Sequence, residues 1–208
     1  MGDRALIEER AFAGEEHLDP AHVVGSDRKT GFDVAAHVAL LCELRLTGDG
    51  TLVDLGAGTG LLAAAIAPFA GRFAAVDPSR AMLDAARARG SFEAAEAGFL
   101  TYLPDFWKAV ALARVRDLLA AGGTLVLRDI VYSCEPAEVD AVFAAWYAAP
   151  PADPADGWTA AEPEHHVRTE HSTFTWVLEP MLEHAGFEIR DGWYSESRTY
   201  ARYVCVKR

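Results

Sequence analysis

The stretch TLVDLGAGTGLL, at residues 51–62, joins an apolar run, a glycine-rich turn and the start of a helix. Residues 51–53 are apolar or β-branched, which is typical of a buried strand. Gly56, Gly58 and Gly60 follow, and glycine allows a tight turn in which no side chain blocks a ligand. Good helix formers fill residues 61–67, so we expect a helix whose N–H groups face that ligand. This order favours an α/β fold with a nucleotide-binding turn.

The spacing of the three glycines narrows the type of nucleotide. A P-loop requires a lysine followed by serine or threonine after its last glycine, and this turn has no lysine. The dinucleotide fingerprint is G-x-G-x-x-G, whereas Gly56, Gly58 and Gly60 give G-x-G-x-G. An acidic residue, Asp54, stands two positions before the first glycine. The turn therefore differs from both of these phosphate-binding turns.

A second strand is predicted at residues 73–77, and it ends in an acidic residue. Asp77 lies 17 residues beyond Gly60. A carboxylate at the end of this strand can accept hydrogen bonds from both hydroxyls of a ribose. The alternative is that Asp77 only caps the helix that starts at Pro78 and Ser79. We interpret Asp77 as a ribose-binding residue because it follows the glycine turn at the right distance.

Together, DLGAGTG and AVDPSRAMLDAARARG resemble the first two motifs of the class I S-adenosylmethionine-dependent methyltransferases, of the type that acts on small molecules. The resemblance implies a Rossmann-like α/β fold, a three-layer sandwich around a doubly wound, mostly parallel seven-stranded sheet with an antiparallel last strand. It also implies S-adenosyl-L-methionine as the cofactor and S-adenosyl-L-homocysteine as the product. The residues that it assigns to the cofactor are Asp54, Gly56, Ala57, Gly58, Gly60, Asp77, Pro78, Met82, Gly98 and Phe99, the last two beside the adenine.

The later part of the chain follows the same fold, except that one strand is missing. A helix that opens at residues 103–107 is predicted to run to about residue 120, followed by a strand at 124–130 and an antiparallel pair at 187–194 and 200–207. The family places a central fourth strand before that helix, but Tyr102 and Leu103 are adjacent and no apolar run near them can supply it. We infer that about 15–25 residues, a strand with its loops, are missing from the sequence there. The alternative is a true deletion, which would leave a badly damaged enzyme.

Length and composition predict a single methyltransferase domain over residues 1–208, with residues 1–46 as an N-terminal lid. No apolar run reaches the length of a membrane span, and the N-terminus lacks the apolar core of a signal peptide, so we expect a cytoplasmic protein with no membrane partner. The net charge of −12 disfavours a nucleic-acid partner. The 3 scattered cysteines fit neither a disulfide framework nor a zinc site, and we expect no metal.

No catalytic motif is decisive, because methyl transfer mainly requires an acceptor that is positioned in line. A general base is needed only where the acceptor must lose a proton. The candidates are His165, His166 and His171 in the run EPEHHVRTEH, and Asp129 at the end of the strand at 124–130. The alternative for the histidines is a polar helix that exposes them to solvent, and for Asp129 a capping role.

The sequence thus predicts methyl transfer from S-adenosylmethionine to a small-molecule acceptor. Two other classes stay open. A nicotinamide-dependent oxidoreductase would bind a pyrophosphate at the glycine turn. This class is disfavoured, because its glycine spacing differs from that of Gly56, Gly58 and Gly60. A non-catalytic cofactor-binding or dimerisation module is favoured by a true loss of the fourth strand. The motifs do not specify the acceptor, the acceptor atom or the oligomeric state, for which a homodimer is one option.

Overall fold

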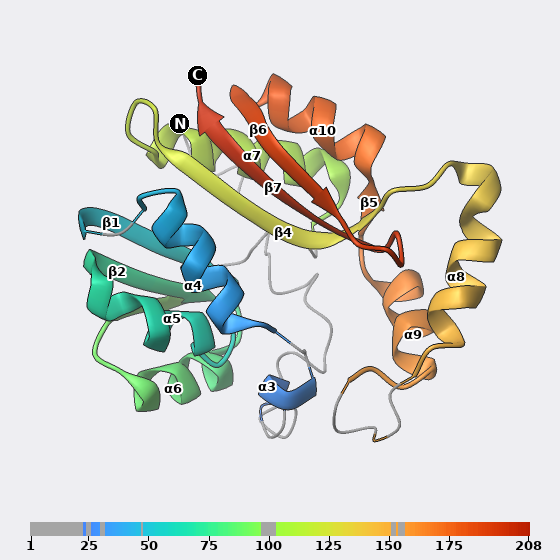
Figure 1. The fold of residues 1–208 in the computed structure, drawn as a ribbon, viewed down its shortest axis with the longest axis horizontal. Helices are drawn as coiled ribbons and strands as arrows, with labels where there is room; N and C mark the ends of the chain where they lie inside the picture. Colours follow the sequence, from blue (N-terminus) through green and yellow to red (C-terminus); the bar gives the residue numbers. More distant parts are fainter. Residues whose placement is uncertain are drawn as a thin grey trace. The chain divides into compact units, whose positions relative to one another are not determined.

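The structure is a computed structural model, and it describes residues 32–46, 48–96, 103–150 and 157–208, together with Val23, Ser26–Lys29 and Asp153. The chain divides into two compact units. The first unit comprises residues 1–99 and 151–158, and the second comprises residues 100–150 and 159–208. Each unit has a sheet of its own (Figure 1). None of the described helices combines the length and the hydrophobicity that a membrane-spanning segment needs.

The first unit contains a parallel sheet with the strand order β1-β2-β3. Its strands are β1 (Gly48–Leu55), β2 (Ala70–Asp77) and β3 (Glu93–Glu96). Leu52 of β1 lies opposite Phe73 of β2, and Asp54 lies opposite Ala75. This register brings the ends of β1 and β2 to the same edge of the sheet, where the glycine turn begins.

The helices of the first unit precede β1 or connect the strands of this unit along the chain. They are α3 (Ser26–Lys29), α4 (Val34–Glu43), α5 (Leu61–Ile66), the 3₁₀ turn η3 (Ala67–Phe69) and α6 (Arg80–Arg89). Asp33 accepts a hydrogen bond from the N–H of Ala36 at 3.0 Å, and α4 follows. Helices α5 and α6 pack against β2 (Figure 1). Ile66 and Leu83 are fully buried and form part of the core beneath the glycine turn.

The second unit contains a mixed sheet with the strand order β5-β4-β7-β6. Its strands are β4 (Thr124–Tyr132), β5 (Thr173–Phe174), β6 (Phe187–Tyr194) and β7 (Tyr200–Lys207). β7 runs antiparallel to both β4 and β6, which confirms the predicted antiparallel last strand. β5 is a short strand, because Thr173 and Phe174 pair in parallel with Val131 and Tyr132.

The helices of the second unit cover its sheet and extend beyond the end of β4. They are α7 (Asp105–Leu118), the 3₁₀ turn η5 (Pro136–Glu138), α8 (Val139–Tyr147), α9 (Ala161–Thr169) and α10 (Thr175–His184). Helix α10 packs against β6 and α7, and α8 packs against α9 (Figure 1). Leu112, Leu182, Phe187 and Tyr203 are fully buried in one apolar core.

The α/β class is confirmed, but the described strands form two sheets, of 3 and 4 strands, rather than one seven-stranded sheet. Along the described residues no strand lies between β3 and α7, where the sequence lacks its fourth strand; Tyr102 itself is outside them. As a result, β1 pairs with β2 alone among the described strands, and residues 124–130 of β4 pair with β7 alone. Val53 and Leu55 of β1 are 50% and 38% exposed. When a strand loses a central neighbour, one of its edges is left unpaired and its apolar side chains become exposed.

The core of the second unit gives a stability prediction. Leu182 of α10 is 0% exposed, so Leu182→Ala leaves a cavity and we expect it to lower the free energy of unfolding by about 2–5 kcal/mol. Leu118 at the end of α7 is 87% exposed, and Leu118→Ala is the matched control with an expected change below about 0.5 kcal/mol. Urea unfolding followed by circular dichroism measures both. Equal effects would contradict the described core.

Candidate functional site

The glycine turn has the geometry of a ligand cradle. Gly56, Gly58 and Gly60 have φ angles of 82°, 53° and 79°. These are left-handed values that side chains other than glycine rarely adopt. A Cβ on Gly60 would lie 2.7 Å from Ala86 Cβ, so Gly60 is required for the packing of the turn against α6. A Cβ on Gly58 would meet nothing within 4 Å, so the structure leaves open space above Gly58.

The N–H groups of this turn are engaged within the first unit. Those of Gly56 and Ala57 donate to the carbonyl oxygen of Val76 at 2.8 and 3.0 Å. That of Gly58 donates to Asp77 Oδ2 at 2.9 Å. The prediction from sequence concerns the N–H groups at the start of the helix that follows; those of Gly56, Ala57 and Gly58 fix the turn to the end of β2. What the turn offers a ligand is the space at Gly58 and the carboxylate beside it.

Asp77 is central to this edge of the sheet. It is 5% exposed, and its other oxygen, Oδ1, accepts a hydrogen bond from the N–H of Ser79 at 2.8 Å. The cap of α6 is Ser79, whose Oγ accepts from the N–H of Met82 at 3.3 Å, so Asp77 is not the capping residue itself. An ionised carboxylate only accepts hydrogen bonds, and its two oxygens match the two donors of a pair of vicinal hydroxyls. The site therefore fits a group with vicinal hydroxyls.

Asp54 supplies a second carboxylate at the same edge. Burial raises the pKa of Asp54 to about 6, and the negative charge of Asp77 contributes to the same shift. At neutral pH the negative charges of the two carboxylates therefore repel each other at this partly buried edge of the sheet. A cation bound beside Asp54 would relieve this repulsion.

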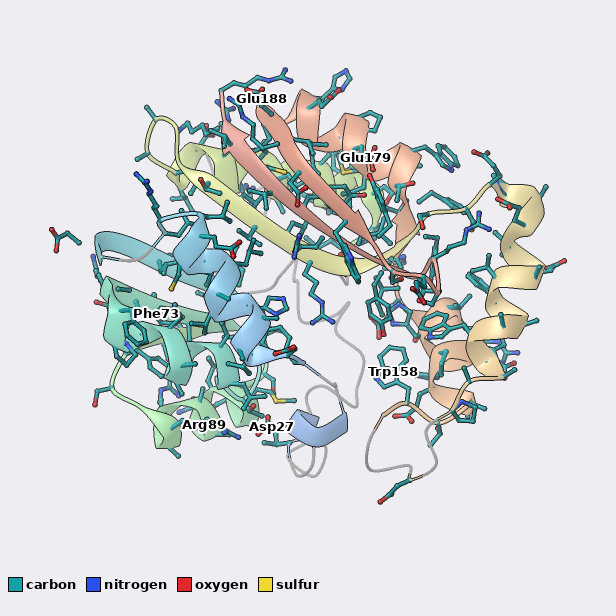
Figure 2. The ribbon with its side chains drawn as sticks, viewed as in Figure 1. Asp27, Phe73, Arg89, Trp158, Glu179 and Glu188 are labelled. Carbon is teal, nitrogen blue, oxygen red and sulfur yellow. The ribbon has the colours of Figure 1, made fainter. Side chains whose placement is uncertain are left out.

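The described part of the N-terminal segment contacts the glycine turn. Asp27 of α3 accepts a hydrogen bond from Thr59 Oγ1, and it also forms an ion pair with Arg89 of α6 (Figure 2). Thr59 is 6% exposed and belongs to the G-x-G-x-G turn itself. These two contacts join α3 to the glycine turn and to α6. Neither Asp27 nor Thr59 was singled out by sequence, because the residues are 32 positions apart.

The remaining cofactor residues predicted from sequence are partly described. Pro78 and Met82 are buried at the start of α6, next to Asp77. Gly98 and Phe99, predicted to lie beside the adenine, are outside the described residues. The structure thus brings Asp54, the glycine turn, Asp77 and the start of α6 together. Their role in binding stays a prediction.

The four catalytic candidates all belong to the second unit, but only two are in its interior. Asp129 of β4 is 8% exposed and His166 of α9 is 3% exposed. His165 and His171 are exposed. The three histidines therefore do not form one cluster. No group of three or more metal-binding side chains occurs among the residues for which a placement is given.

Two residues of this interior were missed by sequence. Lys108 of α7 is 2% exposed, and its Nζ donates to the carbonyl oxygen of His171 at 2.7 Å. Burial lowers the pKa of Lys108, and the nearby Asp129 and Asp105 oppose this shift. Ser172 bonds to His166 Nε2 through its Oγ at 2.8 Å. A usable signal was present only for the pair His166 and Glu170, whose i,i+4 spacing places them on one helix face.

A hollow of about 350 Å³ is lined by residues of α8 and α9. Its lining residues are Asp140, Phe143, Ala144, Tyr147, Glu164, Val167 and Arg168. Glu164 and Arg168 form an ion pair at its rim, one helical turn apart. The hollow is an open surface feature with an apolar floor.

The raised pKa of Asp54 predicts a change in stability with pH. The folded form disfavours the ionised carboxylate, so its contribution to stability is present below about pH 4 and is lost as the pH rises through about 6. Asp54→Asn removes this loss, and we expect it to stabilise the protein by about 1–2 kcal/mol at pH 7.5, and by almost nothing at pH 4. Urea unfolding at both pH values measures this. Asp49→Asn, at an exposed position of the same strand, is the control. A stability difference that does not change with pH would contradict the prediction.

Comparisons with known proteins agree with this geometry. The sequence profile of the methyltransferase-domain family matches residues 53–105, which span the glycine turn and Asp77. No curated protein matches the chain. A chain in the complex between the Haloferax volcanii methyltransferase activator Trm112 and a putative methyltransferase is 16% identical, with a TM-score of 0.62. The match covers 90% of the present chain and 93% of that one.

Two further solved structures have the same fold. A S-adenosylmethionine-dependent methyltransferase from Clostridium acetobutylicum is 15% identical with a TM-score of 0.61, over 85% of this chain and 92% of that one. Magnesium protoporphyrin IX methyltransferase from Synechocystis, solved with bound S-adenosylhomocysteine, is 13% identical with a TM-score of 0.55, over 84% and 81%. Residues 53–105 therefore match the methyltransferase-domain family, and the chain has the Rossmann-like fold of the class I S-adenosylmethionine-dependent methyltransferases.

Proposed function

We propose that the chain is an enzyme that transfers a methyl group from S-adenosylmethionine to a small-molecule acceptor. The observation that carries the proposal is the buried carboxylate of Asp77, held 2.9 Å from the N–H of Gly58 beside open space. A carboxylate that can accept hydrogen bonds from hydroxyl groups therefore lies next to the glycine turn. Both belong to the segment that matches the methyltransferase-domain family. When bound, the cofactor supplies an electrophilic methyl group on a positively charged sulfur.

The residues of the first unit would hold this cofactor by complementary chemistry. Asp77 would accept hydrogen bonds from the ribose hydroxyls through its carboxylate oxygens. Asp54, with Gly56 and Gly58, would hold the methionine end, whose ammonium group offsets the repulsion between Asp54 and Asp77. Pro78 and Met82 would lie beside the nucleoside, together with Gly98 and Phe99.

A small molecule is the favoured acceptor because of charge. The net charge of −12 opposes a polyphosphate chain, whose binding depends on positively charged contacts. The contact of Asp27 with Thr59 supports the assignment of residues 1–46 as a lid, because it joins α3 to the glycine turn. The chain would act as a single methyltransferase domain in the cytoplasm, without a metal.

One observation favours a second candidate, a module that binds the cofactor without catalysis. Within the described ranges, no strand follows β3 before α7, and β1 keeps an unpaired edge with two exposed apolar side chains. A protein with this defect could bind the cofactor with its first unit and fail to turn it over. A nicotinamide-dependent oxidoreductase has no such support, since its glycine spacing differs and residues 53–105 match a methyltransferase domain.

The affinity for S-adenosylhomocysteine tests the role of Asp77. Asp77→Ala removes a charged hydrogen-bond acceptor, so we expect binding to weaken by about 1–3 kcal/mol, as measured by isothermal titration calorimetry. Asp84→Ala, at an exposed position of α6, is the matched control and should leave the affinity unchanged. Unchanged affinity in Asp77→Ala would remove Asp77 from the site.

The class of cofactor is tested by separate titrations with two ligands. We expect S-adenosylhomocysteine to bind and NADH not to bind. The reason is that the turn has the spacing G-x-G-x-G, whereas the turn that binds a dinucleotide pyrophosphate has G-x-G-x-x-G. Fluorescence titration with NADH and calorimetry with S-adenosylhomocysteine measure this. Micromolar affinity for NADH would overturn the proposal. Binding of S-adenosylhomocysteine without methylation of any acceptor in a broad screen would favour the non-catalytic module.

A further inference from the structure

Three side chains of the second unit form a row across neighbouring strands of its sheet. Arg128 of β4 lies directly opposite Arg202 of β7, and Arg202 lies directly opposite Trp193 of β6. Figure 1 shows β4, β7 and β6 side by side in this order. Residues that lie opposite each other on antiparallel strands project from the same face of the sheet. We call Arg128, Arg202 and Trp193 the Arg–Trp row.

The Arg–Trp row lies on the face of the sheet that points away from the apolar core of the second unit. Leu127 and Tyr203, which are next in sequence to Arg128 and Arg202, are buried in that core. Successive side chains of a strand point to opposite faces, so the two arginines point the other way. Arg128 is exposed, Arg202 is partly exposed and Trp193 is 47% exposed. The row is therefore accessible to a ligand in solvent.

The two arginines of the row repel each other across the strands. Like charges at directly opposite positions of a sheet are destabilising. The chain has 31 acidic residues and only 19 lysines and arginines, so a pair of facing arginines stands out against its composition. Asp191 Oδ2 lies 3.1 Å from Arg202 Nη2 and offsets part of the positive charge. An anion bound beside both guanidinium groups would relieve the repulsion between them.

One hydrogen-bond donor of Arg202 lacks an acceptor in the described part of the chain. Its Nε is buried and forms no hydrogen bond with any described residue. A buried donor without a partner costs free energy, and most buried donors in folded proteins have one. The side chain as a whole is 28% exposed, so a small rotation of the guanidinium group can bring the Nε–H group to an acceptor on a ligand. This donor points to an oxygen ligand independently of the charges.

Aromatic rings lie beside the two arginines. The guanidinium carbon of Arg128 lies 5.9 Å from the centroid of the Tyr200 ring, and this cation–π contact holds the guanidinium group at the ring. Next to Arg202, the indole of Trp193 offers a flat apolar surface to solvent. Such a surface beside positive charges suits a ligand with an anionic group and an aromatic body. Neighbouring strands lie about 4.8 Å apart, so the ring of a planar aromatic acid reaches Trp193 from an anionic group held by the arginines.

We propose that the Arg–Trp row binds a small aromatic carboxylate. The guanidinium group is a planar fork of donors that matches the two oxygens of a carboxylate. In the complex the carboxylate lies beside Arg128 and Arg202, with one oxygen accepting from Arg202 Nε, and the aromatic body lies against Trp193. The site belongs wholly to the second unit. It goes beyond the proposed methyl transfer and is compatible with either candidate function.

Titration of the unaltered chain with matched probes tests the class of ligand. The probes are cinnamate, the neutral cinnamyl alcohol, acetate and inorganic phosphate, and isothermal titration calorimetry measures the affinity for each. We expect cinnamate to bind about tenfold more tightly than each of the others, or better, because only cinnamate combines a carboxylate with an aromatic body. Raising the salt concentration from about 0.05 to about 0.5 M should weaken its binding, since salt screens exposed charges.

Single substitutions test the position of the site. Arg128→Gln and Arg202→Gln each remove a charged donor, and we expect each to weaken cinnamate binding by about tenfold to a hundredfold. Trp193→Ala should weaken cinnamate binding by about threefold to tenfold and leave acetate binding unchanged, because acetate has no aromatic body. Arg87→Gln is the matched control, since it removes the same charge at an exposed position of α6 in the first unit. It should leave cinnamate binding unchanged.

The outcomes separate this inference from the proposed function. If cinnamate does not bind the unaltered chain, binds no better than cinnamyl alcohol, or keeps its affinity in both arginine variants, the site is refuted. Tighter binding of inorganic phosphate than of cinnamate would refute the carboxylate class. Circular dichroism checks that each variant is folded, and the comparison of probes on the unaltered chain needs no variant. Titration with S-adenosylhomocysteine tests the first unit separately, so the failure of one ligand to bind leaves the conclusion about the other unchanged.

Discussion

A parallel sheet depends on its central strands, because each central strand pairs on both sides and so joins the strands on its two flanks. In the part of this chain that the structure describes, no strand joins β1 to β4, and the sheet is present as a set of three strands and a set of four. The other features are consistent with this constraint. Each unit has its own buried core, β1 exposes Val53 and Leu55, and the division of the chain into two units falls at residues 99 and 100.

Within the first unit, the carboxylate of Asp77 organises the cradle. Its two oxygens hold the N–H of Gly58 and the N–H of Ser79, so one side chain fixes the glycine turn and the start of α6. The same burial that positions Asp77 raises the pKa of Asp54 to about 6. The shape of the turn is therefore fixed by hydrogen bonds to the oxygens of Asp77. The two carboxylates give the site an excess of negative charge, which suits a ligand that carries hydroxyls and a positive charge.

In the second unit, the buried imidazole of His166 lies within hydrogen-bond distance of the hydroxyl of Ser172. Sequence could place His166 and Glu170 on one face of α9, because helical spacing alone determines this. It could not find Ser172 or Lys108, whose partners lie 6 and 63 residues away along the chain and meet them only through folding. The same reason explains why Thr59 and Asp27 were missed.

Local pattern determined most of the elements. Apolar runs, together with glycines that mark the ends of elements, predicted β1, β2, α6, β4 and the antiparallel pair β6 and β7. The absence of an apolar run after Tyr102 predicted the missing strand. Tertiary structure alone decided that β5 is a strand, since Thr173 and Phe174 pair with β4 instead of extending α10. It also decided that His166 is buried while His165 is exposed. The physical reason is that periodicity fixes which residues share a face, whereas burial and pairing depend on contacts with distant segments that sequence spacing does not encode.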